Sequence, residues 1–162
     1  MHEWVNCAWA APMVAALLEP ALARLNPRLR DGAAVTACLV SALASLALSF
    51  TGVQGVLRWR WVSLPELGNV EFSLLLDPLS LVLAIVVAWV SLAVFVYSLG
   101  YMRGDPGLTR YWVLMLLFVG GMELLVLSEN LVAMLVGWEV VGICSFALIS
   151  YWYQDREEDR AT

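Results

Sequence analysis

Charged side chains are scarce in this sequence of 162 residues, and lysine is missing altogether. Only 14% of the residues are charged, 62% are hydrophobic, and all nine basic residues are arginine. Soluble globular domains are about 25% charged and about half apolar, so the composition excludes that class and indicates a protein that crosses a membrane several times. The net charge of −5 gives no reason to expect nucleic acid as a partner, because what matters is the side of the membrane on which each charge lies.

Motifs that hold cofactors are also missing. The sequence has no G-x-G-x-x-G loop, no cysteine cluster and no soluble segment that would hold a nucleotide or an iron–sulfur cluster. Cys7, Cys38 and Cys144 fall in apolar stretches without metal-ligand spacing, so they are better interpreted as small hydrophobic residues than as a disulfide or metal site. The start, MHEWVNCAW, has no basic segment typical of a cleavable signal peptide. We expect no cofactor and no metal in this chain, and a first helix that is retained.

Five apolar runs are long enough to span a membrane, since about 20 residues at 1.5 Å per residue cross a hydrocarbon core about 30 Å thick. These runs cover residues 4–23, 33–52, 77–100, 109–128 and 130–151. Pro12, Glu19 and Pro20 interrupt the first run. A kinked or tilted helix is expected there, because neighbouring helices can satisfy the backbone groups that a proline frees. The predicted fold is an all-α membrane protein of five transmembrane helices.

A short β-hairpin is predicted between the second and third runs. The segment GVLRWRWVSLPELGNVEFSLLL alternates apolar and polar residues on both sides of LPELGN, a pattern typical of two strands joined by a turn. Trp59 and Trp61 suit the headgroup region of a membrane better than a ligand-stacking site. We therefore expect the hairpin outside the hydrocarbon.

The arginines predict the orientation. With five helices, Arg58 and Arg60 lie on one side of the membrane, and the other seven share the opposite side: Arg24, Arg28, Arg30, Arg103, Arg110, Arg156 and Arg160. Basic residues favour the cytoplasmic side. The N-terminus and the hairpin are thus expected outside, the C-terminal QDREEDRAT is expected in the cytoplasm, and the protein is expected in a prokaryotic plasma membrane.

Glu139 is the main candidate functional residue. It lies about halfway along the run NLVAMLVGWEVVGICSFALISYWY, too far from either end for its side chain to reach water. A charge near the bilayer centre costs roughly 3 kcal/mol or more, so such a residue is a functional-site hypothesis. The alternative is a protonated, hydrogen-bonded acid. A buried carboxyl group beside a movable cation can exchange protons. Because the arginines fall at expected loops or interfaces, the cation is expected outside these 162 residues.

Four other polar residues are expected at helix ends. Asp77 precedes Pro78 in LLLDPLSL and is predicted to cap the third helix. Glu129 and Asn130 form the SEN turn, where they are predicted to cap the last helix in a structural role. Glu123 lies about one turn inside the outer end of the fourth helix, where it either reaches the interface or acts as a weaker site of proton translocation.

The series LLLDPLSL, YSLGYM, a basic loop and LVLSENLVAMLVGWEVVGICSFALI resembles the N-terminal part of the antiporter-like, proton-translocating subunits of respiratory complex I, especially chain L (mitochondrial chain 5). Subunits of Mrp-type antiporters, membrane-bound hydrogenases and F420H2 dehydrogenases share this region. The resemblance covers about residues 65–155, the predicted start of the proton-translocating region. Residues 1–64 are then an N-terminal two-helix region with the first half of the hairpin, and residues 156–162 a cytoplasmic tail at which the chain looks truncated.

The resemblance implies roles for several residues. Glu139 occupies the position of a glutamate that pairs with a lysine two helices later, and Asp77 matches an aspartate with a structural role. Glu129 stands where aspartate is more frequent, Phe146 where tyrosine is common, and Glu123 where an apolar residue is usual. The resemblance also implies that NADH or F420H2, FMN, iron–sulfur clusters and quinone bind to partner subunits, and that the partners are other membrane subunits in the lipid bilayer.

Three functions remain open. The first is the N-terminal part of a membrane subunit in a redox-driven proton pump of the NADH-quinone oxidoreductase type, in which any enzyme activity belongs to the complex. The second is a component of an Mrp-type sodium/proton antiporter, which needs no electron donor. The third is a structural assembly module in which Glu139 is neutral and static.

Overall fold

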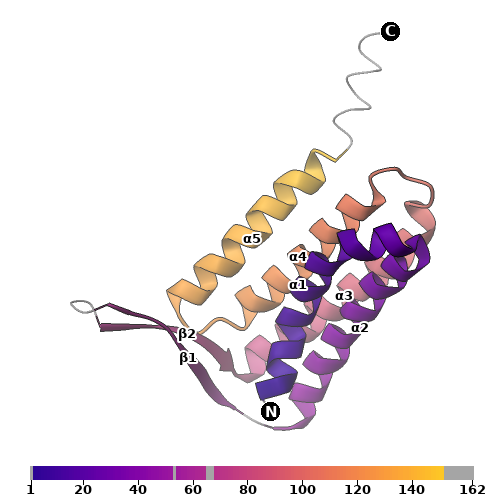
Figure 1. The fold of residues 1–162 in the computed structure, drawn as a ribbon. Coiled ribbons are helices and arrows are strands. Elements are labelled where there is room, and N and C mark those ends of the chain that lie inside the picture. Colours follow the sequence, from indigo (N-terminus) through magenta and orange to yellow (C-terminus); the bar gives the residue numbers. More distant parts are fainter. Residues whose placement is uncertain (1, 53, 65–67, 152–162) are drawn as a thin grey trace.

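The computed structural model describes residues 2–52, 54–64 and 68–151 (Figure 1). Its elements are α1 (His2–Leu25), α2 (Pro27–Phe50), β1 (Gly55–Leu64), β2 (Gly68–Leu76), α3 (Pro78–Tyr101), α4 (Leu108–Val126) and α5 (Leu131–Ile149). All five helices are long and apolar enough to cross a membrane. The predicted fold class is confirmed, and the chain is an integral membrane protein.

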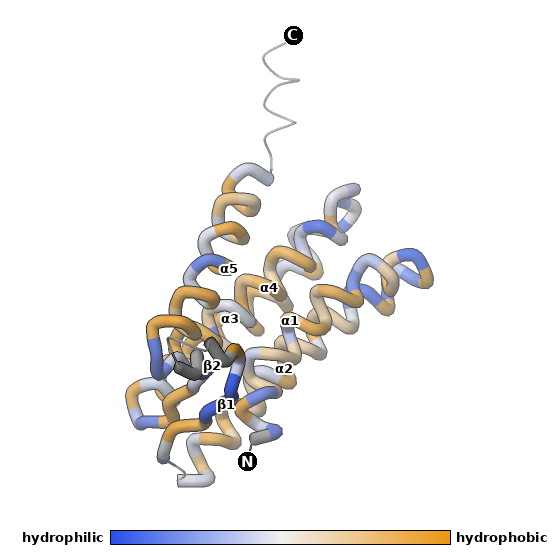
Figure 2. Tube along the Cα trace, turned by 60° about the vertical axis from the view of Figure 1, so that its left-hand side comes forward, coloured by the Kyte–Doolittle hydropathy of each residue, from blue (hydrophilic) through white to orange (hydrophobic). Residues whose placement is uncertain are grey.

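The helices form a bundle with α5 at its edge. The helix α1 packs against α2 and α4, α3 packs against α2, and α5 packs against α4 and touches β2. The N-terminus and the hairpin lie at one end of the bundle, and the C-terminal end of α5 lies at the other (Figure 1). Hydrophobic residues dominate the middle of the helices, whereas hydrophilic residues gather near their ends and on the hairpin (Figure 2).

The first two helices differ from their predicted bounds. The helix α1 continues through Pro12 and Pro20. The helix α2 begins at Pro27, six residues before the predicted start, because Asn26 caps it by accepting a hydrogen bond from the Arg28 amide at 2.9 Å. Proline suits the first helical position, where its missing N–H costs no intrahelical bond. Arg28 and Arg30 therefore lie in a helix, not in the predicted loop.

The predicted hairpin is confirmed. Strands β1 and β2 pair antiparallel from Gly55 opposite Leu76 to Leu64 opposite Gly68, with an irregularity between Arg60 and Val62; the turn, residues 65–67, lies outside the described residues. Near the helices the hairpin carries apolar side chains into a core with α1, α2 and α4. The buried members of this core include Val5, Ala8, Leu48, Leu57, Leu74, Leu76 and Leu124.

Three glycines set the close packing of α4. A Cβ atom at Gly120 would lie 2.8 Å from the carbonyl oxygen of Trp9 in α1. A Cβ atom at Gly121 would lie 3.0 Å from the side chain of Val140 in α5, and one at Gly137 would lie 2.9 Å from the backbone nitrogen of Leu125. Small residues let membrane helices approach closely. Gly120 of α4 therefore allows the close approach of α1, and the adjacent Gly121 allows the close approach of α5.

Candidate functional site

Glu139 lies on the face of α5 that points away from α4. It is the ninth of the 19 residues of α5. Gly137 packs against α4, and two residues along a helix correspond to a rotation of about 200°. Glu139 is accordingly exposed, and so are its apolar neighbours on this side: Leu135 58%, Trp138 65%, Ile143 66% and Phe146 75%. The Glu139 carboxyl group thus lies in the middle of an exposed apolar face of α5.

No cation accompanies Glu139 in the described part of the chain. The ion pairs there join Arg30 to Asp31, and Arg58 to Glu71 and Glu129. A charged group in the middle of a membrane helix is rare, and it normally faces a protein interior or a water-filled cavity and pairs with another group. Glu139 departs from this rule within the described residues, where its carboxyl group is exposed on the apolar face of α5.

Glu123 is buried inside the bundle. Its side chain is 0% exposed, and neither carboxyl oxygen has a hydrogen-bond partner among the described residues. Ser45 of α2 lies beside it, but the Ser45 hydroxyl donates to the carbonyl oxygen of Ser41 at 2.9 Å. The expectation that Glu123 reaches the interface is wrong, because α4 turns this side chain inward. An unpaired carboxylate is costly to bury, and the ion pairs among the described residues do not include Glu123.

A second buried polar cluster lies at the opposite end of the bundle from the hairpin. Glu19 of α1 is 0% exposed, its oxygens have no hydrogen-bond partner in the described part of the chain, and Arg30 and Asp31 of α2 act on it electrostatically. Arg30 lies 2.8 Å from the Asp31 carboxylate and donates to the Thr109 hydroxyl at 3.1 Å. The indole of Trp112 in α4 donates to Asp31 at 2.9 Å.

Sequence reasoning missed this cluster. It treated Glu19 only as an interruption and Arg30 as a loop residue. A signal was available in the sequence: Glu19 interrupts an apolar run, and the next helix contains Arg30 and Asp31 side by side in sequence. Buried charges are normally paired, and here Arg30 and Asp31 form an ion pair.

Polar groups at the hairpin end hold helix termini. Asp77 is the N-cap of α3 and accepts from the Ser80 amide at 2.7 Å. Hydrogen bonds from the Ser80 hydroxyl and then from the Ser80 amide hold the pKa of Asp77 below its usual range. Asn130 is the N-cap of α5: its side-chain oxygen accepts from the Ala133 amide at 2.9 Å, and its side-chain nitrogen donates to the Glu71 carbonyl oxygen at 2.7 Å.

Glu129 does not share the capping role predicted for it. Its carboxylate accepts a hydrogen bond from the Ser73 hydroxyl at 2.5 Å and lies 3.6 Å from Arg58, so it binds the hairpin instead. The backbone makes the same connection: the Glu129 amide donates to the Ser73 carbonyl oxygen at 3.0 Å, and the Leu75 amide donates to the Leu127 carbonyl oxygen at 2.8 Å. The α4–α5 turn is therefore joined to β2 by backbone and side chains.

At the opposite end, Tyr151 joins α5 to the loop between α3 and α4. Its hydroxyl donates to Asp105 at 2.6 Å, and the Arg110 guanidinium lies 4.9 Å from the centre of its ring. Burial, and then the hydrogen bond to Asp105, raise the pKa of the Tyr151 hydroxyl. The helix that carries Glu139 is thus attached at both ends while one face stays free.

Two family models match the chain. The model described as "NADH-Ubiquinone oxidoreductase (complex I), chain 5 N-terminus" matches residues 61–112, and the model "NADH:quinone oxidoreductase/Mrp antiporter, TM" matches residues 128–162. The second match contains Glu129, Asn130 and Glu139. Both matches fall where the sequence motifs indicated the resemblance.

Individual relatives agree with these models. NADH-quinone oxidoreductase subunit L of Escherichia coli is 38% identical over 128 residues, which are 74% of this chain and 21% of the relative. The subunit of the same name from Rickettsia bellii is 33% identical over 156 residues, which are 93% of this chain and 24% of the relative. The chain thus spans about a fifth to a quarter of the length of these relatives.

A solved structure has the same arrangement of helices. The Mrp complex from Dietzia sp. contains a chain that superposes with a TM-score of 0.74 and 33% identity, over 90% of this chain and 16% of that one. The chain described here therefore belongs to the family of antiporter-like membrane subunits of complex I, in a portion that includes the chain 5 N-terminus.

Proposed function

We propose that this chain is part of an antiporter-like membrane subunit that translocates protons, driven by redox chemistry in partner subunits. The observation that carries the proposal is Glu139, a carboxyl group halfway along a spanning helix on a face that the described residues leave uncovered. The family matches and the relatives named NADH-quinone oxidoreductase subunit L support it. In this proposal NADH or F420H2, FMN, iron–sulfur clusters and quinone bind to partner subunits.

Glu139 acts in this proposal as the acidic member of a Glu–Lys pair. The sequence contains no lysine, so the lysine is supplied from outside these 162 residues, across the uncovered face of α5. Low-dielectric surroundings favour the neutral form of a carboxyl group, and a nearby cation favours the charged form. Movement of the lysine away from Glu139 would therefore favour proton binding by the carboxyl group, and its return would favour proton release, in the middle of the membrane.

Glu123 is a weaker candidate for the same route. Glu123 is buried between α4 and α2 and has no hydrogen-bond partner in the described part of the chain. Such a site suits a carboxylic acid that keeps its proton, because an unpaired carboxylate is costly to bury. In this role it exchanges that proton only when water enters beside Ser45. If Glu123 is instead a static packing group, Glu123→Gln will leave transport unchanged.

The test of the proposal is a Glu139→Gln change in the membrane complex that contains this chain, reconstituted in liposomes with a pH-sensitive dye. The change keeps the shape of the side chain and removes its charge. We expect the rate of proton pumping to fall at least about tenfold, equivalent to about 1.4 kcal/mol in the barrier, while the amount of assembled complex stays the same. The matched control is Glu3→Gln, an exposed glutamate in the first turn of α1, which should pump normally. Pumping by Glu139→Gln at the parental rate would contradict the proposal.

The orientation is proposed from the distribution of arginines. Arg24, Arg28, Arg30, Arg103 and Arg110 lie at the end of the bundle opposite the hairpin. We place that end in the cytoplasm of a prokaryotic cell and the hairpin outside, following the excess of basic residues. Cysteines introduced at Val62 of β1 and at Arg103 should react with a charged maleimide from opposite sides of the membrane. Labelling of both from the same side would overturn this orientation.

A second candidate function is sodium/proton exchange in an Mrp-type antiporter. The superposition on a chain of the Dietzia Mrp complex over 90% of this chain favours it. Proton movement that follows an imposed sodium gradient without any electron donor would select this function. Movement that requires an electron donor would select the redox-driven pump, and movement under neither condition would leave an assembly role with a static Glu139.

A further inference from the structure

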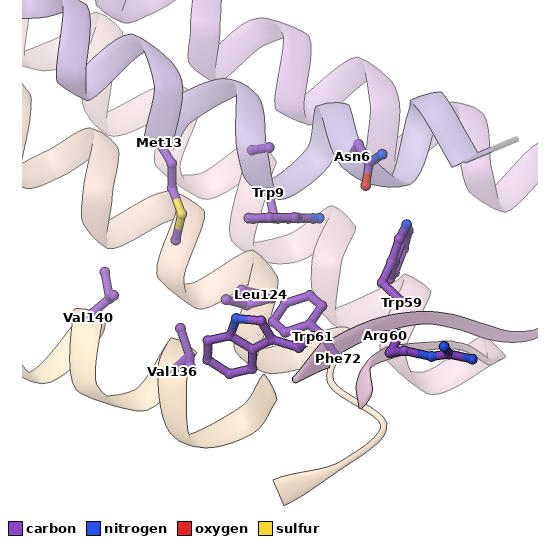
Figure 3. Close-up of a pocket in the computed structure, with 11 residues that line it drawn as sticks. Asn6, Trp9, Met13, Trp59, Arg60, Trp61, Phe72, Leu124, Val136 and Val140 are labelled. Carbon is purple, nitrogen blue, oxygen red and sulfur yellow. The ribbon is translucent and has the colours of Figure 1, made fainter. Parts of the chain in front are cut away.

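A cavity of about 610 Å³ opens between α1, the hairpin, α4 and α5 (Figure 3). Its walls are mostly apolar, with Trp9 and Met13 from α1, Trp61 and Phe72 from the hairpin, and Val136 and Val140 from α5. The volume lies within the range of about 300–1,000 Å³ that is usual for small-molecule sites. Glu139 is not among the residues that line the cavity.

The two ends of the cavity differ in polarity. Figure 3 shows Asn6, Trp59 and Arg60 on one side, and Met13, Val136 and Val140 on the other. From Asn6 to Met13 the wall formed by α1 rises about 10 Å, at 1.5 Å per residue. This is about a third of the 30 Å hydrocarbon core. A molecule that fits would be amphipathic, with its polar part near the middle of β1.

One buried hydrogen-bond donor, on a residue that lines this cavity, has no partner among the described residues. The indole nitrogen Nε1 of Trp9 is buried and makes no hydrogen bond to any described residue, and its ring packs against Phe72 with centroids 5.9 Å apart. Figure 3 shows this nitrogen on the side of Asn6 and Trp59. The indole N–H can only donate, and a buried donor without a partner costs about 1–3 kcal/mol. An acceptor oxygen on a bound molecule would remove this cost.

Arg60 supplies a positive charge at the polar end. It is exposed and forms no ion pair within the described ranges, whereas Arg58, two residues earlier, lies 3.8 Å from Glu71 and 3.6 Å from Glu129. Arginine binds phosphate groups well, because its planar guanidinium donates two parallel hydrogen bonds. The cavity therefore combines apolar walls with Trp9, which can donate a hydrogen bond to one oxygen, and Arg60, which can bind an anionic group.

We propose that this cavity binds one phospholipid. An acyl chain lies along Met13, Val136 and Val140, an ester carbonyl oxygen accepts from Trp9, and the phosphate binds Arg60. A quinone has an apolar tail and carbonyl oxygens but no anion for Arg60. A protein helix uses its backbone carbonyl oxygens within the helix, so it would have to bring both a side-chain oxygen to Trp9 and an acidic side chain to Arg60.

The test is photo-crosslinking of the full chain in vesicles of phosphatidylethanolamine and phosphatidylglycerol, with a diazirine on the acyl chain of the phosphatidylglycerol. Mass spectrometry should locate the label on Met13, Val136 or Val140. Ala10 lines the cavity, so Ala10→Phe should fill it and lower this labelling about fivefold or more. The matched control is Ala21→Phe, at an exposed position of the same helix, which should leave the labelling unchanged.

A surface variant tests the headgroup without filling the core. Arg60→Gln should lower the labelling about threefold, whereas Arg103→Gln, an exposed arginine at the other end of the bundle, should not. Labelling that resists both Ala10→Phe and Arg60→Gln would reveal only bulk lipid contact and overturn the proposal. The proposal would also be overturned if a diazirine-labelled quinone displaced the phospholipid, or if a protein segment was crosslinked in its place.

Discussion

Replacing Gly137 by alanine should separate α5 from α4. The new Cβ atom would lie 2.9 Å from the Leu125 nitrogen, 3.0 Å from the Gly121 carbonyl oxygen and 3.1 Å from the Leu125 Cα. These are backbone atoms and cannot rotate away. Since favourable contacts begin at about 3.5 Å, the helices must separate by about 0.6 Å, and a gap of that size removes about a quarter or more of the attraction between atoms that touched before.

The expected loss of stability is about 1–2 kcal/mol. Overpacking costs typically about 1–3 kcal/mol, and the better helix propensity of alanine returns up to about 1 kcal/mol. The free energy of unfolding can be measured for the full chain in mixed micelles, by titration with a denaturing detergent and circular dichroism. Gly142→Ala is the matched control, because a Cβ atom at Gly142 meets nothing within 4 Å. Gly142→Ala takes the same gain in helix propensity without a clash, so the close approach of α4 and α5 is refuted if Gly137→Ala proves as stable as Gly142→Ala.

Three further changes test other contacts. Protonation of Asp77 should loosen the start of α3, because the pKa of Asp77 is lowered in the folded protein. The contribution of Asp77 to stability is therefore present above the unfolded pKa of about 3.9 and is lost as the pH falls through the folded pKa. Faster hydrogen exchange of the Ser80 amide at low pH would reveal this loss. Trp112→Phe should cost about 1–3 kcal/mol of unfolding free energy, because Asp31 loses the indole hydrogen bond. Asn130→Ala should cost about 1 kcal/mol for the lost cap of α5.

Each of these changes has a control. Asp77→Asn keeps an acceptor oxygen but does not titrate, so exchange that still accelerates in acid would rule out Asp77 as the cause. Trp138→Phe alters an indole that is 65% exposed, and equal losses in Trp138→Phe and Trp112→Phe would contradict the buried bond. Asn130→Asp keeps the capping oxygen, so it should restore most of the stability that Asn130→Ala loses.

The helices and the hairpin were predictable because their signals are local. A run of about 20 apolar residues spans the hydrocarbon whatever its neighbours are, and alternation on both sides of a turn predicts a hairpin. The capping positions of Asp77 and Asn130 follow from short motifs. The start of α2 carries the same kind of signal in Asn26 and Pro27, but the arginines that follow favoured a loop.

The environments of the acids were not predictable. In α4 and α5 nearly every face is apolar, so hydrophobic periodicity does not tell which side of the helix points inward. The rotation of each helix is decided by contacts with its neighbours, such as those at Gly120 and Gly137. As a result Glu123 is buried in the bundle, whereas Glu139 lies on the free face.

The bonding of the α4–α5 turn to the hairpin has a mechanical consequence. Two backbone hydrogen bonds and the contacts of Glu129 and Asn130 tie this turn to β2, and paired backbone of this kind moves as one cooperative unit. A displacement of the hairpin would therefore displace the first turn of α5 as well. Together with the hydrogen bond from Tyr151 to Asp105 at the other end of α5, this bonding fixes the position of the Glu139 carboxyl group along the bundle relative to the hairpin.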